Sequence, residues 1–310
     1  MTTTIASRPV RRAVRDGAVI AGLLFLGYLF IVVAPQQGTV GFDAFAYWNV
    51  DPADPYQVGV GGLGAFNYTP PIARLFGAFG LLEWASFLWI WLALLIGNLI
   101  WLGGRGVRIV WLLAFPPIAL ELYHANIHLW IAAAIVLGFR YPWTWGFVLL
   151  TKVTPGIGLL WFAVRREWRA LAIALGVTGA VVAISLLLDL QLWREWIAFI
   201  ASTPDGGSVG QFNLSLPLWL RLPAAAAVVA WGGLTNRRWA VPVAATLALP
   251  VLWLSGFAIC AALAAESMWP SRPATEPPTD EPGVRDPAGT LGSGPSGQAH
   301  GTIAGDTGPA

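Results

Sequence analysis

Uncharged apolar runs recur between residues 17 and 265 and restrict this part of the chain to a membrane-embedded fold. Residues 17–34 form the first run, and 84–104 and 170–188 are others of similar length. At about 1.5 Å per helical residue, such runs span the roughly 30 Å hydrocarbon core of a bilayer. Charged residues make up only 11% of the 310 residues, which is too few to cover a soluble surface. We therefore expect an all-α polytopic membrane helical bundle.

Shorter apolar segments indicate further helices, some of them half-length, which brings the expected total to about eight to ten. Residues 69–82 open on two prolines and predict a partly inserted helix. Residues 142–151 and 153–164 form one apparent run, which Lys152–Pro155 breaks into two half-length pieces because proline disrupts a helix. The remaining candidates are 109–120, 127–139, 215–234 and 239–265, the last interrupted by Pro250.

The distribution of basic residues predicts how the helices are oriented. Four arginines precede the first run, so residues 1–16 are expected in the cytoplasm. If the helices alternate from there, the cytoplasmic N-terminus and the membrane domain, 17–269, together have twelve basic residues inside, the four N-terminal arginines included, and four outside. Loops 35–67 and 189–214 would then lie on the outer face. The four basic residues of the outer half are Arg74, Lys152, Arg194 and Arg221.

Composition separates the end of the chain from the rest and excludes several classes of function. Residues 270–310 hold eight Pro, eight Gly and no aromatic residue, so we expect a disordered tail that cannot bury apolar surface. The single cysteine, Cys260, excludes a disulfide framework and a thiolate metal cluster. A net charge of +2 without a basic run argues against nucleic acid as a partner.

The polar loop 35–67 contains three acidic residues among aromatic ones. Asp51 and Asp54 each precede a proline and are interpreted as turn formers. Asp43 instead lies one helical turn before Tyr47, in a stretch predicted to form an interfacial amphipathic helix. A carboxyl group in such partly dry surroundings has a raised pKa, which suits a general base.

Lys152 is the only lysine of the chain and lies inside an apolar run. One interpretation is a lysine whose ammonium reaches the membrane interface on its apolar stem. The other interpretation is a lysine that faces a cavity. It follows from the helix break directly after Lys152, because broken helices line cavities in membrane proteins. A cation at such a cavity suits a phosphate group at the outer membrane boundary.

Glu121, His124 and His128 are spaced i, i+3 and i+7, and we predict that they share one helix face. Two histidines four residues apart can form half of a metal site, but no third strong ligand and no Asp-x-Asp pair accompanies them. We therefore favour hydrogen-bonding histidines and predict neither a metal nor another cofactor.

Four motifs lie in a fixed order within residues 15–265. They are Asp43 before an aromatic stretch that ends on Asp54-Pro55-Tyr56, then Tyr68-Thr69-Pro70-Pro71, Lys152-Val153-Thr154-Pro155 and Asn213-Leu214-Ser215-Leu216. With them the chain resembles glycosyltransferase family 87, the polyprenol-phosphate-dependent mannosyltransferases of actinobacteria with the GT-C membrane fold. Two segments depart from the family: His124-Ala125-Asn126 stands where it has Gly-Gln-x-Asn, and Pro250–Ser255 lacks its histidines.

The resemblance implies an inverting hexosyltransferase of cell-envelope biosynthesis, a multi-pass plasma-membrane protein whose active site faces outside. It implies a polyprenyl-phosphate-mannose donor, a glycolipid or glycan acceptor and surrounding membrane lipid. Asp43 would be the catalytic base, and Lys152 with Arg74 would bind the donor phosphate. Substrate contacts are expected at Tyr47, Tyr56, Tyr68, His124, Asn126, His128 and Asn213.

Other functions fit the same sequence. Related enzymes take arabinofuranose from the same kind of carrier, so the sequence does not distinguish mannose from arabinofuranose as the transferred sugar. A lipid-sugar transporter would explain broken helices and buried charges, although the chain shows no internal repeat. The missing family histidines leave room for a non-catalytic membrane partner.

The predicted orientation can be tested by cysteine labelling. Cysteine introduced at Thr39 or Ser208 should react with an impermeant thiol reagent added to intact spheroplasts, because both loops are predicted outside. Labelling that requires lysis would contradict this orientation.

Overall fold

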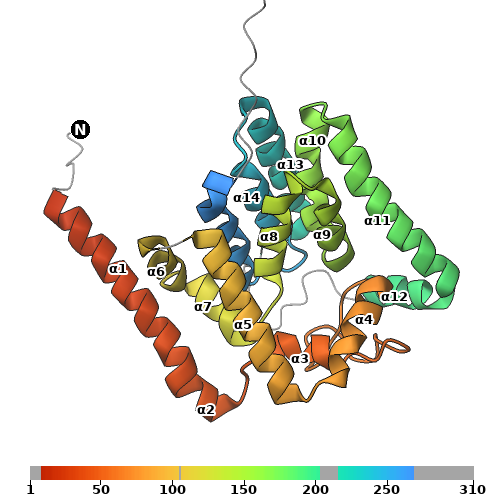
Figure 1. Cartoon of the computed structure of the whole chain (residues 1–310), viewed down its shortest axis with the longest axis horizontal. Coiled ribbons are helices and arrows are strands. Elements are labelled where there is room, and N and C mark those ends of the chain that lie inside the picture. The colour runs from red at the N-terminus through yellow and green to blue at the C-terminus, as the bar shows by residue number, and fades with distance from the viewer. Residues whose placement is uncertain (1–7, 105, 203–215, 269–310) are drawn as a thin grey trace, which may run out of the picture. The chain divides into compact units, whose positions relative to one another are not determined.

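The computed structural model of the chain describes residues 8–104, 106–202 and 216–268. Within these ranges every regular element is a helix (Figure 1). The predicted tail, 270–310, and Asn213 lie outside the described residues. The α-helices are α1 (Arg8–Tyr28), α2 (Ala34–Gln37), α3 (Phe42–Trp48), α4 (Pro70–Phe76), α5 (Trp84–Gly103), α6 (Val107–Leu113), α7 (Pro116–His124), α8 (His128–Gly138), α9 (Trp145–Thr151), α10 (Leu160–Val164), α11 (Trp168–Leu188), α12 (Leu190–Ser202), α13 (Leu218–Thr235) and α14 (Ala240–Leu247).

Short helices of other types complete the fold. A π-helical stretch, η1 (Leu29–Val33), joins α1 to α2, and 3-10 helices form the remaining segments. These are η2 (Gly77–Leu81), η3 (Pro142–Thr144), η4 (Thr154–Leu159) and η5 (Leu254–Met268).

Four helical segments of the described chain are long and apolar enough to cross a membrane, which confirms the all-α polytopic class. They are Val10–Gln37, α5, α11 and α13. The bent pair α6 and α7, with an angle of 71° at its break, makes a fifth if it counts as one span. The predicted segments 127–139 and 153–164 and the second part of 239–265 correspond to the shorter apolar helices His128–Gly138, Thr154–Val164 and Leu254–Ala265. The predicted piece 142–151 is divided between η3 and α9.

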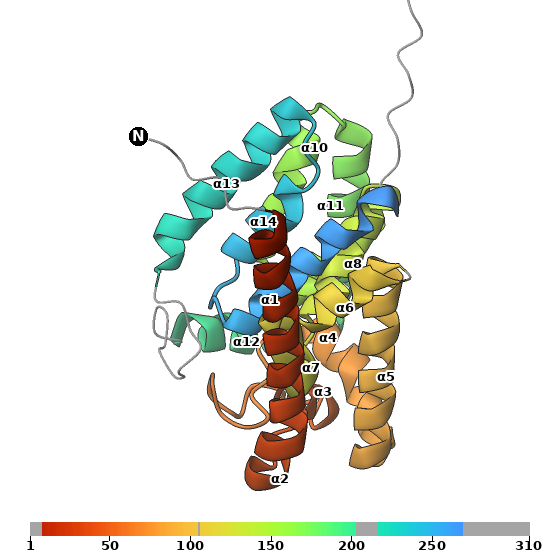
Figure 2. The same cartoon turned by 90° about the vertical axis from the view of Figure 1, so that its left-hand side faces the viewer.

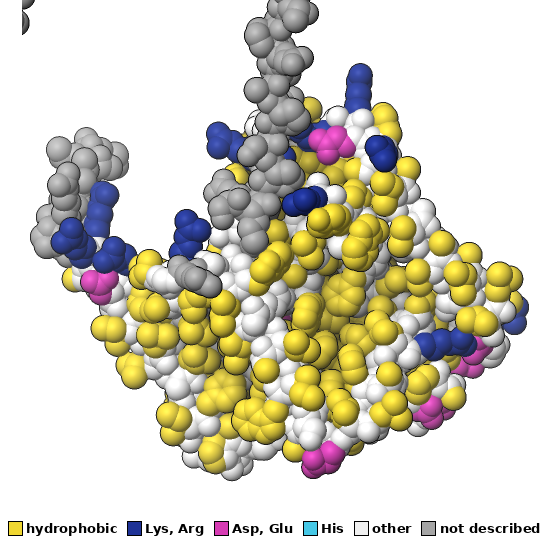
Figure 3. Space-filling model, in the orientation of Figure 1, with side chains coloured by type: hydrophobic (Ala, Val, Ile, Leu, Met, Phe, Trp, Pro, Cys, Tyr) yellow, Lys and Arg dark blue, Asp and Glu magenta, His cyan; other side chains and the backbone are white. Residues whose placement is uncertain are grey.

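The short helices form the interior of this bundle and the long ones surround it (Figures 1 and 2). In α8, nine of the 11 residues are buried, and it packs against η5, α5 and α9. By contrast, only Ala174 and Ser185 are buried among the 21 residues of α11. Apolar side chains that face outward along a helix with satisfied backbone groups suit contact with lipid. Figure 3 shows a largely apolar face, with most of its Lys and Arg side chains towards the top and a few at the lower right beside acidic ones.

The predicted helix break at Lys152–Pro155 is confirmed. α9 ends at Thr151, Lys152 has an extended backbone, and η4 begins at Thr154. Irregular backbone is tolerated at membrane depth where protein surrounds it. Here α8 and α14 provide that cover, because α8 packs against α9 and α14 packs against η4.

The polar segment 189–214 begins with a helix, α12, where the sequence indicated only a loop. Its apolar residues recur at helical spacing, so that Leu192 and Trp193 are buried while Arg194 is exposed. Trp193 Nε1 donates to Ser185 Oγ at 3.1 Å, which fastens α12 to the end of α11. Acidic and basic residues within the segment obscured this amphipathic pattern.

Arg221 forms a buried clamp between α13 and the segment that follows α14. The residue is 5% exposed. Its guanidinium donates to the carbonyl oxygens of Leu216 (2.7 Å), Leu247 (2.6 Å), Leu249 (2.7 Å) and Pro250 (3.0 Å). A cation at the C-terminal end of α14 satisfies carbonyl groups that have no partner within the helix.

Replacing Arg221 by Met should destabilise the fold by about 3 kcal/mol or more, because several buried carbonyl groups lose a charged donor. Thermal or denaturant unfolding in detergent measures the change. The exposed Arg194→Met serves as control and should shift stability by no more than about 0.5 kcal/mol. Equal effects of the two substitutions would show that the clamp contributes nothing.

Candidate active site

Asp43 owes its position to the turn that starts α3. Gly41 has a left-handed backbone (φ 77°), and a Cβ there would lie 2.6 Å from Leu88 Cδ1. Glycine therefore both permits the turn and lets α3 approach α5. The Gly41 N–H donates to the carbonyl oxygen of Tyr123 at 2.9 Å, so the start of α3 is tied to α7. Asp43 follows in the first turn of α3, where the helix dipole favours a carboxylate.

The Asp43 carboxylate is held by a hydrogen-bond network that reaches two tyrosines. Asn126 Nδ2 donates to Asp43 Oδ2 at 2.6 Å. Asn126 Oδ1 accepts from Tyr47 OH at 3.0 Å and from the N–H of Ile127 at 2.7 Å. Tyr47 OH also lies 3.0 Å from Tyr68 OH. Because two groups donate to Oδ1 of Asn126, that atom must be the oxygen of the amide. The nitrogen, Nδ2, therefore faces Asp43.

A second chain of side chains runs from Lys152 into the interior. Lys152 Nζ lies 3.0 Å from His128 Nε2, and His128 Nδ1 lies 2.8 Å from Glu121 Oε2. Glu121 Oε1 accepts from the N–H of Leu129 at 3.1 Å. The side chains of Glu121 and His128 are 0% and 1% exposed, so the polar chain is closed off behind Lys152.

The prediction that Glu121, His124 and His128 share one helix face is wrong. α7 ends at His124, Ala125 has a left-handed backbone (φ 52°), and α8 begins only at His128. The sequence spacing could not reveal this turn, since no glycine or proline marks it. The turn nevertheless places the Glu121 and His128 side chains in direct contact, which residues seven positions apart on a continuous helix would not make.

The site therefore has two layers. Asp43, His124 and Lys152 are partly exposed, whereas Asn126, His128 and Glu121 beneath them are buried. Burial raises the pKa of the Asp43 carboxyl, and the charges of His124 and Lys152 partly offset this rise. A raised pKa makes an ionised carboxylate a better proton acceptor, which is what a general base requires.

Three of the predicted substrate residues are tyrosines joined to this region by hydrogen bonds. Burial raises the pKa of Tyr47 and Tyr68, so both phenols stay protonated and can donate hydrogen bonds. Tyr56 OH donates to the carbonyl oxygen of Tyr68 at 2.9 Å. Thr69 Oγ1 donates to the carbonyl oxygen of Leu150 at 2.7 Å. The first bond closes the loop before α4 on itself, and the second connects its end to α9, two residues before Lys152.

Among the described residues, Arg74 makes no hydrogen bond to either of these two chains of side chains. Its guanidinium contacts the Asp189 carboxylate at 3.3 Å, and each side chain is 36% exposed. Exposed ion pairs of this kind are worth at most about 1 kcal/mol. The role of Arg74 at the donor phosphate stays a prediction, as does that of Asn213, which lies outside the described residues.

Glu121 is the residue that sequence reasoning left out of the site. It is the only acidic residue between Glu83 and Glu167, and it is fully buried. An isolated acid within apolar sequence of a membrane protein signals function, and that signal was present in the sequence. Within the described ranges, no three His, Cys, Asp or Glu side chains meet as a metal site.

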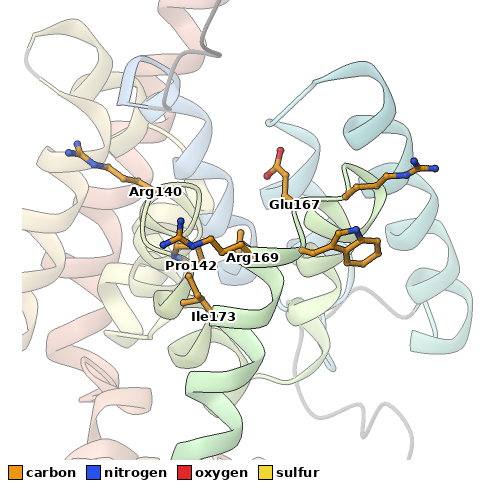
Figure 4. Close-up of a pocket in the computed structure, with 8 residues that line it drawn as sticks. Arg140, Pro142, Glu167, Arg169 and Ile173 are labelled. Atoms are coloured by element: carbon orange, nitrogen blue, oxygen red, sulfur yellow. The ribbon is translucent and has the colours of Figure 1, made fainter. Parts of the chain in front are cut away.

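A shallow cavity of about 590 Å³ lies beyond the other end of α8 from His128. Arg140, Pro142, Glu167, Arg169 and Ile173 are among its lining residues (Figure 4). It contains none of the residues of the two polar chains. Its arginines fall on the side that the basic residues predict to be cytoplasmic.

The chain was compared with known protein families, curated proteins and solved structures. The model of glycosyltransferase family 87 matches residues 66–276, more than half of the chain. This chain belongs to glycosyltransferase family 87. The family match includes Glu121, Asn126, His128 and Lys152 but begins after Asp43. Searches of curated proteins and of solved structures found no match.

The hydrogen bonds of Asn126 should contribute to the stability of the fold, and unfolding measurements test this. Asn126→Leu leaves the buried N–H of Ile127 and the Asp43 carboxylate without a partner, which should cost about 1–3 kcal/mol. Tyr47→Phe removes one hydroxyl and should cost about 1 kcal/mol. Unfolding in detergent compares the two. A smaller loss for Asn126→Leu than for Tyr47→Phe would contradict the network.

Proposed function

We propose that this glycosyltransferase transfers a hexose, mannose, from a polyprenyl-phosphate carrier to a glycolipid or cell-envelope glycan. The transfer would take place on the outer face of the plasma membrane and would invert the anomeric centre. The observation that carries the proposal is the pairing of a partly exposed carboxylate, Asp43, with a partly exposed ammonium, Lys152, whose charge acts on it.

The chemistry assigns separate roles to the two groups. Asn126 donates to Oδ2 of Asp43, and Oδ1 would accept the proton of the acceptor hydroxyl. The acceptor oxygen then attacks the anomeric carbon while the bond from that carbon to the phosphate oxygen breaks on the opposite face. Attack opposite the leaving group inverts the configuration, as general-base assistance without a covalent intermediate requires.

The leaving group needs a cation rather than an acid. The electron pair of the broken bond stays on the lipid phosphate, which is already a stable anion. Lys152 would stabilise the charge that develops there. The position of Lys152 in a helix break within an apolar domain supports a lipid-linked donor, because an isoprenoid tail can lie in the bilayer while its phosphate reaches the break.

The proposal is tested by a transfer assay with the purified full chain. Labelled polyprenyl-phosphate-mannose and a membrane lipid extract should yield labelled product. Asp43→Asn keeps the size of the side chain but cannot take a proton, so the rate should fall by about 10²–10⁴-fold while donor binding stays intact. Asp51→Asn is the matched control, since Asp51 accepts a turn hydrogen bond from the N–H of Ala53.

Two further readouts sharpen this assay. The wild-type rate should fall as the pH drops through the raised pKa of Asp43, because a protonated carboxyl cannot act as a base. A polyprenyl-phosphate-arabinofuranose donor tests the second sugar on the same protein. Wild-type transfer by Asp43→Asn would refute the base, and no transfer from either donor would favour a transporter or a non-catalytic partner.

A further inference from the structure

The buried pair behind Lys152 has no role in the transfer chemistry proposed above. Glu121 and His128 touch neither the sugar nor the attacking hydroxyl, because both are enclosed by protein. A buried ion pair is weak evidence for stability, since apolar side chains of similar volume often serve as well. The pair therefore calls for another explanation, and its connection to Lys152 provides one.

The hydrogen-bond directions along the chain follow from the donors available. An ammonium only donates, so His128 Nε2 must accept from Lys152. The proton of the neutral imidazole is then on Nδ1, which donates to Glu121 Oε2. Glu121 Oε1 receives the N–H of Leu129. Each member thus has one orientation, and the carboxylate is held by donors on both oxygens.

This arrangement decides where the ammonium can point. A lysine has a flexible four-carbon stem and three rotatable donors. One donor of Lys152 is engaged by His128 on the buried side, which leaves two for the partly exposed side that it shares with Asp43. Glu121 fixes the orientation of the imidazole, and the imidazole fixes the ammonium, so the remaining donors stay directed to this side before an anion binds.

We propose that Glu121 and His128 are positioning residues that hold the Lys152 ammonium towards the site, so that the phosphate of a lipid-linked sugar, and of the lipid phosphate that it leaves behind, binds there. The inference rests on the proposed role of Lys152 as the phosphate ligand. The sequence carries all three groups over only 32 positions, but the turn at Ala125 and the break after Thr151 bring them into one line. A carboxylate that orients an imidazole, which in turn orients a reactive group, is a recurring arrangement in enzymes.

The test compares two probes that differ only in the phosphate. A short-chain polyprenyl phosphate and the matching polyprenol are titrated into the full chain in detergent. Lys152→Met and His128→Leu should each weaken binding of the phosphate probe roughly tenfold or more, the loss expected for a charged hydrogen bond. Polyprenol binding should not change. The double variant should lose little beyond either single one, because the residues act as one unit.

Conservative variants separate positioning from folding. His128→Gln keeps one acceptor and one donor and should restore phosphate binding, whereas Glu121→Gln removes only the charge and should weaken it. Asn98→Leu is the matched control: Asn98 is buried and donates to the carbonyl oxygen of Leu129 at 2.8 Å, so it contacts α8 without touching Lys152. It should leave the preference for phosphate over polyprenol unchanged.

The possible outcomes separate a failure of the phosphate role of Lys152 from a failure of the positioning role of Glu121 and His128. If Lys152→Met binds the phosphate probe like the wild type, the phosphate role of Lys152 and this inference both fall. If Lys152→Met weakens binding but His128→Leu and Glu121→Gln do not, only the positioning role is overturned. Equal loss of both probes in the His128 and Glu121 variants would mean a structural role alone. Transfer activity is scored separately, so the proposed base is not at issue here.

Discussion

The turn between α7 and α8 has to satisfy its backbone polar groups inside a membrane domain, and the polar site is built on how it does so. The Asn126 N–H donates to the carbonyl oxygen of Glu121 at 3.1 Å, and the Ala125 carbonyl accepts from Trp91 Nε1 at 2.9 Å. The Ile127 N–H uses the side chain of Asn126. Unpaired groups at this depth would each cost several kcal/mol, so the turn has little freedom to rearrange.

Because the turn is held in this way, its side chains have defined directions. Asn126 presents its amide nitrogen to Asp43, and His128 presents Nε2 to Lys152. Each partly exposed reactive group is thus supported by one buried partner. The directions of both partly exposed groups are therefore set by buried side chains of one turn rather than by their own flexible stems.

The peripheral helices enclose this interior. Long spans such as α1 and α11 present mostly apolar surface outward, which suits lipid. The broken segments sit inside the bundle, where α8, α14 and η5 pack on one another. Irregular backbone and polar side chains are therefore concentrated where protein rather than lipid surrounds them.

The sequence alone determined the class of the fold and the elements from which the site is made. Uncharged apolar runs of sufficient length predict the long spans, and Pro155 predicts the helix break near Lys152. Both could be read from the sequence because they depend only on residues close together in the chain. Asp43 and Lys152 were recognised because charge is costly in apolar surroundings. The helix α12 was missed, since its amphipathic pattern was interpreted as polar loop sequence.

Only the tertiary structure decided that Asn126 supports Asp43 and that Glu121 supports Lys152 through His128. These contacts join segments up to 83 positions apart, and they depend on a left-handed turn at Ala125 that no residue type in the sequence announces.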